Sequence, residues 1–285
     1  MAQPKVYLIT GCSSGVGYHL CKAALAAGHK VIATARNLNK SPAVVSELES
    51  LGAHWCRMDV TSADLRAQIE MAIAVYRRVD VLINNAGIAI GGPVEHTELS
   101  LARAVFETNF FGVMRIVQDI IPIMRSQGSG TIVNISSGST LRSLPTIGIY
   151  AASKCAIEGF TESLKAEVAA FGIRVLLAHP GDMRTGFIQN STMTTLNEAY
   201  KGTMAETVLN VLTGMAGKGP IDPVRAGQLI VNAIDGTGLM ARYLENDYMR
   251  LPLGSEILRG YQQRVDSLTE SLNDFSTVAK SVEFE

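Results

Sequence analysis

The amino-acid sequence predicts an α/β fold, in which a parallel sheet carries helices on both of its faces. Short apolar runs rich in β-branched residues alternate along the chain with segments of helical periodicity. A glycine-rich turn joins the first apolar run to the first helical segment. No repeat, low-complexity tract or linker interrupts this alternation, so residues 1–285 are expected to form a single domain. These observations predict one Rossmann-type, doubly wound sheet of about seven strands with a C-terminal helical extension.

Each strand is predicted from a short apolar run bounded by turn residues. The predicted strands are Lys5–Thr10, Lys30–Ala35, His54–Met58, Val79–Asn84, Gly130–Ser136, Ile173–His179 and a last one near Ala241–Glu245. Helices are expected in most intervals, the longest running from about Ser100 to Gln127. Residues 186–220 are rich in Thr, Met and Gly and show no strand pattern, and residues 246–285 are expected to lie beyond the core.

Composition excludes several functional classes. The formal net charge is −1 over 285 residues, which gives no electrostatic signature of nucleic-acid or acidic-membrane binding. No apolar run approaches the ~20 residues needed to span a bilayer, and the N-terminus lacks a signal-peptide layout. The cysteines show no C-x-x-C pairing, so we expect free thiols and a location in the reducing cytoplasm. The five histidines are dispersed, so we expect no metal site. The cysteines are Cys12, Cys21, Cys56 and Cys155.

The glycine-rich turn has the spacing G-x-x-x-G-x-G, formed by Gly11, Gly15 and Gly17. Glycines let such a turn close, and they let backbone N–H groups approach a pyrophosphate at a helix N-terminus. An ordinary glycine-rich turn between a strand and a helix is the alternative. Because a strand precedes this turn and a helix follows it, the pattern favours nucleotide binding.

Tyr150 and Lys154 are four residues apart in a predicted helix, so their side chains share one face. An ammonium group near a phenol favours the phenolate, which predicts a Tyr150 pKa below its usual value of about 10. A tyrosine tuned in this way is a general acid near neutral pH. On its own, such a pair is equally consistent with a half-buried surface contact.

The motifs together resemble the short-chain dehydrogenase/reductase family, in its single-domain, non-extended form. The resemblance covers roughly residues 5 to 245 and rests on the order and spacing of five motifs. The glycine-rich loop and the end of the second predicted strand are similar to those of the 17β-hydroxysteroid/retinol dehydrogenase branch. The motifs are Thr10-Gly-x-x-x-Gly-x-Gly17, Asn84-Asn-Ala-Gly87, Ser137, Tyr150-x-x-x-Lys154 and Pro180-Gly181.

The resemblance implies a catalytic set. In it, Ser137 orients the substrate oxygen, Tyr150 exchanges its proton, and Lys154 tunes Tyr150 and holds the cofactor ribose. Asn109 distorts its helix and holds a water that connects Lys154 to solvent. Ser137 is preferred to Ser136 because it precedes Tyr150 by the thirteen residues usual in the family. A loop-capping serine and a surface asparagine are the alternatives.

The end of the second predicted strand bears on the choice of cofactor. Ala35 stands where relatives that use NAD carry Asp, and Arg36 follows, placed to pair with a 2′-phosphate. We therefore expect NADP(H), with a solvated loop arginine as the alternative. The stretch from Asn84 to Gly87 is also consistent with a plain turn. The expected cofactor-binding residues are Gly11, Ser13, Ser14, Gly15, Val16, Gly17, Arg36, Asp59, Val60, Asn85, Ala86, Gly87, Tyr150, Lys154, Pro180, Gly181 and Thr185.

The implied reaction is hydride transfer between a nicotinamide and a carbonyl or secondary alcohol. Ser137, Tyr150, Met183 and Phe187 are the expected substrate contacts, and residues 186–220 would cover the substrate. Methionine surfaces suit bulky apolar ligands, although a core role for these methionines is equally consistent. A non-redox regulator or scaffold, or an enzyme steering a reactive intermediate, is the alternative. A homodimer or homotetramer through the helices carrying Asn109 and Tyr150 is expected by resemblance.

Overall fold

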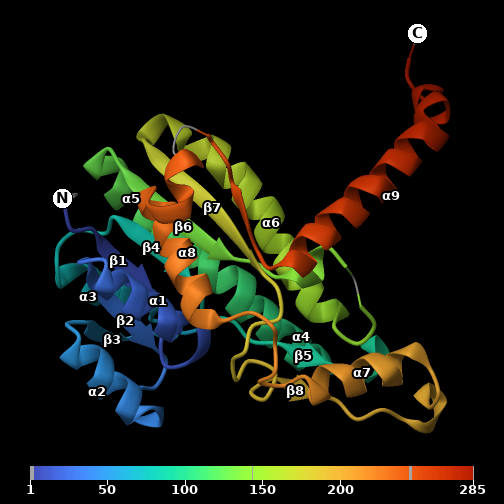
Figure 1. Cartoon of the computed structure of the whole chain (residues 1–285), viewed down its shortest axis with the longest axis horizontal. Helices are drawn as coiled ribbons and strands as arrows, with labels where there is room; N and C mark the ends of the chain where they lie inside the picture. The colour runs from blue at the N-terminus through green and yellow to red at the C-terminus, as the bar shows by residue number, and fades with distance from the viewer. Residues whose placement is uncertain (1–2, 143, 244–245, 285) are drawn as a thin grey trace.

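The computed structural model describes residues 3–142, 144–243 and 246–284, and its centre is a seven-stranded, wholly parallel sheet (Figure 1). The strand order β3-β2-β1-β4-β6-β7-β9 reverses between β1 and β4. This arrangement confirms the predicted α/β class. The strands are β1 (Val6–Ile9), β2 (Lys30–Ala35), β3 (His54–Arg57), β4 (Val81–Asn84), β6 (Gly130–Ile135), β7 (Ile173–Pro180) and β9 (Arg250–Leu253).

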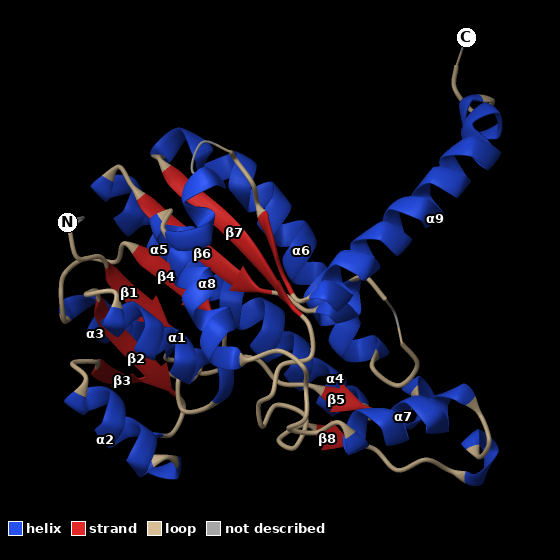
Figure 2. Ribbon diagram, viewed as in Figure 1, coloured by secondary structure: helices blue, strands red, loops and turns tan. Residues whose placement is uncertain are grey.

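Helices cover both faces of the sheet (Figure 2). Because successive strand residues point to opposite faces, Tyr7 and Ile9 of β1 pack in one cluster and Val6 and Leu8 in another. The first cluster lies against α1 and α8, and the second against α3, α5 and α6. The helices are α1 (Gly15–Ala26), α2 (Pro42–Ser50), α3 (Leu65–Ala74), α4 (Leu99–Phe106), α5 (Gly112–Gln127), α6 (Gly148–Val168), α7 (Met204–Gly214), α8 (Pro223–Asp235) and α9 (Ser255–Lys280).

The last strand was predicted in the wrong place. Gly238–Tyr243 forms a 3-10 helix, and residues 244–245 of the predicted strand lie outside the described residues. The seventh strand is instead β9, whose Leu251 and Leu253 are buried beside β7. Pro252 between them disguises the strand in the sequence, yet proline is tolerated on an edge strand such as this one. Residues 250–253 therefore belong to the core, and the extension begins with α9.

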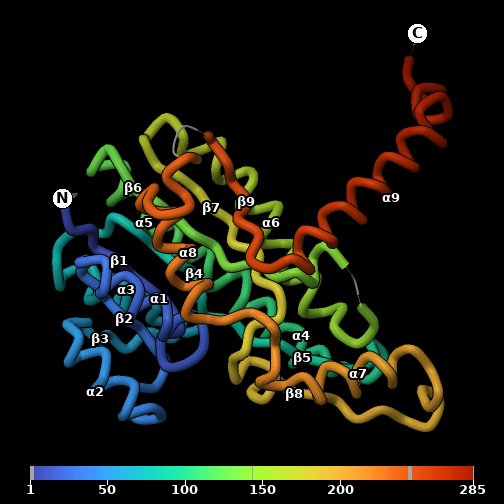
Figure 3. The backbone as a smooth tube through the Cα atoms, in the orientation of Figure 1, coloured from blue at the N-terminus to red at the C-terminus, as the bar shows by residue number. Residues whose placement is uncertain are grey.

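Residues 186–220 also differ from the expectation that they contain no strand. Thr192–Met193 forms a two-residue strand, β8, that pairs in parallel with β5 (Ile90–Gly91), and α7 follows (Figure 3). A Cβ at Gly91 would overlap the sulfur of Met193, so glycine is needed for this close approach. Two residues are too few to produce a periodicity signal. The segment is thereby fixed against the chain that follows β4.

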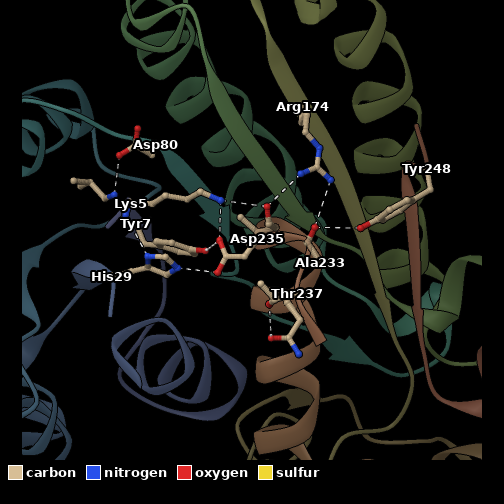
Figure 4. A network of polar contacts seen from close by, with 12 residues as sticks. Lys5, Tyr7, His29, Asp80, Arg174, Ala233, Asp235, Thr237 and Tyr248 are labelled. Carbon is tan, nitrogen blue, oxygen red and sulfur yellow. Dashed lines mark hydrogen bonds and ion pairs between the residues drawn. The ribbon is translucent and has the colours of Figure 1, made fainter. Parts of the chain in front are cut away.

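A polar network ties the C-terminal end of α8 to the amino ends of the central strands (Figure 4). Asp235 accepts from Lys5 Nζ at 2.7 Å and from Tyr7 at 3.3 Å, and it lies 2.8 Å from His29 Nε2. Burial raises the pKa of this carboxyl, but its hydrogen bonds to Lys5 and His29 outweigh burial and lower it overall. Arg174 donates to carbonyls in the last turn of α8. These contacts lie at the amino ends of the strands, opposite the edge at which doubly wound sheets form their ligand crevice.

Helix α9 projects from the body of the protein toward the C-terminus (Figure 1). It is the longest helix among the described residues, with 26 residues. Within the described part of the chain, no helix is long and apolar enough to cross a membrane.

Candidate active site

Two loops meet at the carboxyl edge of the sheet, between β1 and β4. The backbone of Gly11 lies in the left-handed region, at φ +71°, and a Cβ there would lie 2.9 Å from the Cα of Ala86. Any larger residue at position 11 would push the loop after β1 away from the loop after β4. The strand order reverses at this point, which is where doubly wound sheets form their ligand crevice.

Asn85 and Thr10 clamp these two loops together. Asn85 Nδ2 donates to the carbonyl oxygens of Thr10, at 2.8 Å, and Gly11, at 3.1 Å. Thr10 Oγ1 in turn accepts from the backbone nitrogens of Asn85 and Ala86, both at 3.0 Å. A Cβ at Gly17 would overlap the carbonyl oxygen of Gly11. The Asn85 amide therefore holds the glycine loop, and Thr10 is an additional positioning residue. The expected contact of Asn85 with the cofactor stays a prediction.

The N-terminus of α1 is open to an anion. Ser13 is half-buried and Ser14 is exposed, and the Ser14 side chain makes no capping hydrogen bond. The first N–H groups of the helix have no acceptor within it, and the first turn contains no acidic residue that would neutralise the positive end of the helix dipole. The methyl-bearing side chain of Thr185 lies 3.8 Å from where a Cβ of Gly15 would stand. Thr185 thus reaches over the helix start from the loop after β7, and Val16 is half-buried beneath it in the core.

The ends of β2 and β3 lie side by side. Ala35 is buried, whereas Arg36 is exposed and has no hydrogen bond or ion pair to any residue in the described ranges. Asp59 is half-buried, and its Oδ1 accepts from the backbone and the hydroxyl of Thr61 at 3.0 and 2.8 Å. Val60 is buried. The two residues expected to distinguish NAD from NADP are therefore an apolar side chain, Ala35, and a cation, Arg36, that has no partner among the described residues.

A π-helical turn, Glu107–Phe111, separates α4 from α5 and contains Asn109. Asn109 is 1% exposed. Its Oδ1 accepts from Ile88 N at 2.9 Å, and its Nδ2 donates to Ile88 O at 2.9 Å and to Ser153 Oγ at 3.0 Å. Asn109 therefore joins three segments of the chain. The expected long helix from Ser100 to Gln127 is continuous but locally widened at this turn, and such turns are frequent at functional sites.

Lys154 lies beside Asn109 at the same edge. Its side chain is 6% exposed, and Nζ donates to the Ile135 carbonyl at 2.8 Å. A Cβ at Gly87 would lie 3.3 Å from Asn109 Oδ1 and 3.7 Å from Lys154 Nζ. Gly87, Asn109 and Lys154 therefore converge, and the missing side chain at Gly87 keeps the space next to the ammonium group open.

The pKa of Tyr150 does not follow the expectation from sequence. Burial raises it to about 12, and a hydrogen bond with the Ser137 side chain opposes this rise. Lys154 Nζ lies 5.9 Å from the centre of the Tyr150 ring and donates to a carbonyl instead, while burial lowers the Lys154 pKa to about 8. The expected lowering of the Tyr150 pKa by Lys154 is therefore absent, and burial sets the direction of the shift. Tyr150 carries its proton at neutral pH, which is the form that can donate.

The two neighbouring serines have different environments. Ser137 Oγ accepts from Ser139 N at 3.2 Å, which combines a loop-capping role with its hydrogen bond to Tyr150. Ser136 is 1% exposed and donates to Glu158 Oε1 at 2.7 Å, and His179 Nε2 lies 2.7 Å from the same oxygen. Ser136 therefore belongs to a buried network, and Ser137 is the serine next to Tyr150.

The remaining predicted residues follow β7. Gly181 N donates to Leu253 O at 3.1 Å, next to Pro180, so β9 supports this loop. Met183 is 8% exposed and packs in the core against α1 and α8, which corresponds to the core role left open for the methionines. The Phe187 ring is 40% exposed, with its centre 5.8 Å from that of Tyr150. Phe187 therefore lies next to Tyr150, whereas Met183 packs in the core.

Sequence reasoning missed Glu256, the second residue of α9. Its Oε1 accepts from Asp182 N at 2.5 Å, and a Cβ at Gly181 would overlap its carboxylate. Burial, and then the charge of Glu256, raise the pKa of the Asp182 carboxyl. The contact joins residues that are far apart in the sequence, so no local pattern indicates it.

The arrangement of these residues agrees with the family relationship. The model of the short chain dehydrogenases matches residues 5–195. The chain belongs to the short-chain dehydrogenase/reductase family. It is an oxidoreductase of the kind that interconverts alcohols and carbonyls, and it lies in the branch that includes retinol and 17β-hydroxysteroid dehydrogenases.

Similar proteins come from fungi, bacteria and animals. Oxidoreductase claN of Passalora fulva is 44% identical over 74% of this chain and 96% of its own length. Retinol dehydrogenase 8 of Homo sapiens is 36% identical over 83% of this chain and 79% of its own. A short-chain dehydrogenase structure from Streptomyces avermitilis is 34% identical, covers 100% of both chains and superposes with a TM-score of 0.87.

Solved structures of this fold hold either nicotinamide cofactor. A family member from Burkholderia phymatum contains NAD and is 25% identical, covering 94% of this chain and 95% of its own, with a TM-score of 0.80. A gluconate 5-dehydrogenase from Burkholderia cenocepacia contains NADP and is 26% identical, covering 90% and 96%, with a TM-score of 0.69. Family membership therefore establishes that the cofactor is a nicotinamide dinucleotide. The choice between NAD and NADP, which differ by a phosphate on the ribose, depends on local residues.

Proposed function

We propose that the protein is an NADP(H)-dependent oxidoreductase that transfers hydride between the nicotinamide and a carbonyl or secondary alcohol of a bulky apolar substrate. The observation that carries this proposal is the convergence of four groups at one edge of the sheet. Tyr150 forms a hydrogen bond with Ser137. Lys154 and Asn109 converge next to Gly87. These groups supply a proton donor, an orienting hydroxyl and a cation, and the cation lies beside the position where Gly87 has no side chain.

The residues present fit a dinucleotide. Gly11 and Gly17 allow only a bare backbone, and the unpaired N–H groups at the start of α1 suit a pyrophosphate. Thr185 reaches over the same helix start from above. Lys154 Nζ stands next to the space left by Gly87, where it would hold ribose hydroxyls. When bound, NADP(H) supplies or accepts the hydride at C4 of its nicotinamide.

Side chains of the protein transfer the proton and stabilise the groups that give it up. In reduction, Ser137 donates a hydrogen bond to the substrate oxygen, and Tyr150 gives its proton to that oxygen as the C–H bond forms, which yields the alcohol. In oxidation, Tyr150 takes the alcohol proton back. Lys154, with its pKa lowered to about 8, stands close enough to stabilise the phenolate that remains. Asn109 holds Ile88 and Ser153 in place around these groups.

The choice of NADP(H) rests on the end of β2. Ala35 offers no carboxylate to a ribose 2′-hydroxyl, and Arg36 has an exposed guanidinium without a protein partner in the described residues. A 2′-phosphate would supply that partner through two parallel hydrogen bonds.

The choice of a bulky apolar substrate rests on the surroundings of Tyr150. Phe187 is 40% exposed at 5.8 Å from the tyrosine ring, and Ile88, held by Asn109, is 38% exposed. Exposed apolar side chains next to a reactive group suit a ligand with apolar bulk. A relative named for retinol is consistent with this class. The four cysteines are free, which is consistent with action in the reducing cytoplasm.

The testing experiment is oxidation of NADPH and NADH, run side by side, against a panel of small and bulky ketones. Faster turnover with NADPH on bulky apolar ketones is expected. The Tyr150→Phe variant is expected to bind NADPH with unchanged affinity and to lose about 10²–10⁴-fold in turnover. Substantial turnover by this variant would remove Tyr150 from its proposed role, and tight NADPH binding without any turnover by the wild type would favour a non-redox protein.

A further inference from the structure

Helix α9 is attached to the body only at its root. Ile257 is buried against Gly138, and the Tyr261 hydroxyl lies 3.0 Å from His179 Nδ1. Gly260 packs against Leu141. From residue 262 to residue 280, every residue except Ser276 is exposed, and the helix extends away from the sheet (Figure 1). Apart from Arg264, whose charge acts on Cys155, about twenty residues of helix, roughly 30 Å, therefore have no partner among the described residues.

The exposed part of α9 has a regular apolar stripe. Val265, Leu268, Leu272 and Phe275 are 55%, 57%, 68% and 60% exposed. Their spacing alternates between three and four residues and continues to Ala279. Leu258 and Tyr261 have the same spacing in the root, where Tyr261 is occupied by its contact with His179. This is the a and d pattern of a heptad repeat, with a period of 3.5 residues. A helix that packs on a globular core usually has a broader stripe.

We propose that α9 forms a two-helix coiled coil with α9 of a second copy of this chain. A seam of period 3.5 is covered fully by another helix with the same period, and the chain itself supplies one. The positions that flank the seam are compatible with self-pairing. They carry one charge, that of Arg264, which in a parallel pair lies opposite Thr269 of the partner helix. The flanking residues are Gln262, Arg264, Thr269, Ser271, Ser276 and Val278.

The charges of α9 also disfavour a membrane as the occupant. Asp266, Glu270 and Asp274 lie on the outer face, away from the seam. Helices that lie on membranes carry lysine and arginine on the polar face, which attract anionic lipids. An acidic outer face is instead typical of a solvated coiled coil.

The experiment compares the molecular masses of three full-length proteins by light scattering and sedimentation. The seam variant is Leu268→Glu/Leu272→Glu. The control is Ser267→Glu/Asn273→Glu, which adds the same charge to the same helix on its outer face. Since none of these side chains contacts the described body, oxidoreductase turnover per chain and the cooperativity of thermal unfolding are expected to stay unchanged, which separates lost association from misfolding.

The wild type and the control are expected to have the same mass, and the seam variant is expected to have half of it. Equal masses for all three proteins, or a monomeric wild type, would overturn the proposal. Cosedimentation of the wild type with phosphatidylcholine vesicles, lost in the seam variant, would likewise overturn it in favour of a lipid surface.

Discussion

Asn109 Nδ2 donates a 3.0 Å hydrogen bond to Ser153 Oγ, and Ser153 Oγ donates in turn to the Tyr150 carbonyl at 2.7 Å. Asn109 and Ser153 are both buried. This chain of two hydrogen bonds connects the π-helical turn to the helix that carries Tyr150 and Lys154. The position of the proposed acid therefore depends on a side chain 41 residues earlier in the sequence.

Asn109→Ala is expected to weaken both stability and activity. The substitution leaves the Ser153 hydroxyl and the two backbone groups of Ile88 without their partner, which costs about 1–3 kcal/mol. A fall in Tm of about 2–10 °C is expected, together with a loss of turnover larger than that of Ser153→Ala. Calorimetry and single-turnover kinetics on both variants measure this, and an Asn109→Ala protein with wild-type Tm would contradict the connection.

Ser137→Ala and Ser136→Ala are expected to separate catalysis from stability. Ser137 bonds to Tyr150, so its loss is expected to lower kcat about 10²-fold with little change in Tm. Ser136 bonds to buried Glu158, so its loss is expected to cost about 1 kcal/mol and to spare most turnover. Parallel kinetics and urea unfolding check both. The reverse pattern would make Ser136 the serine that meets the substrate.

Arg36→Ala is expected to raise the Kd for NADPH about 10- to 100-fold and to leave that for NADH nearly unchanged, because a charge-assisted bond to a phosphate is lost. Titration of each cofactor by fluorescence gives the two constants. Arg103→Ala, which removes another exposed arginine on α4, serves as the control and should alter neither. If Arg36→Ala left the ratio of the two dissociation constants unchanged, Arg36 would be a solvated side chain that does not contact the cofactor.

The buried Lys154 is expected to make stability depend on alkaline pH. Its pKa is about 8 in the folded protein and 10.5 in the reference state, so above about pH 8 the unfolded chain binds more protons than the folded one. Stability therefore rises with pH in this window, by on the order of 2 kcal/mol up to about pH 10. Tyr150 acts in the opposite direction only above about pH 10.

Urea unfolding at about pH 8 and about pH 10 measures this effect. Because other groups titrate in the same window, the relevant quantity is the difference between the wild type and Lys154→Met. The variant is expected to lose the rise. A variant with the wild-type slope would show that Lys154 is solvated rather than buried.

The sequence was sufficient for the fold class and for the order of the motifs, because periodicity and glycine spacing are local signals. Six of the seven predicted strands are present in the sheet. The seventh was misplaced because Pro252 breaks the apolar pattern of an edge strand. The pair β5 and β8 is too short to give a pattern.

The candidate site was predictable as a set of residues but not in its energetics. The direction of the Tyr150 pKa depends on burial, which comes from segments distant in sequence and has no local signature. The same is true of Asn85, whose amide is used by the loop of Thr10 and Gly11, and of the contact between Glu256 and Asp182. Phe187 and Met183 are four residues apart, yet only the fold determines that one faces Tyr150 and the other the core.

The π-helical turn at Glu107–Phe111 constrains the length of the chain as well as its composition. Such a turn contains one residue more than a regular α-helical turn would. Deleting a single residue there would let α4 and α5 join as one uniform helix and would remove the widened turn that places Asn109. Asn109 would then turn away from Ser153 even though every residue type needed for the chemistry was still present. In this segment, point substitutions are expected to be tolerated more often than insertions or deletions. The number of residues between α4 and α5 is therefore itself a requirement of the site.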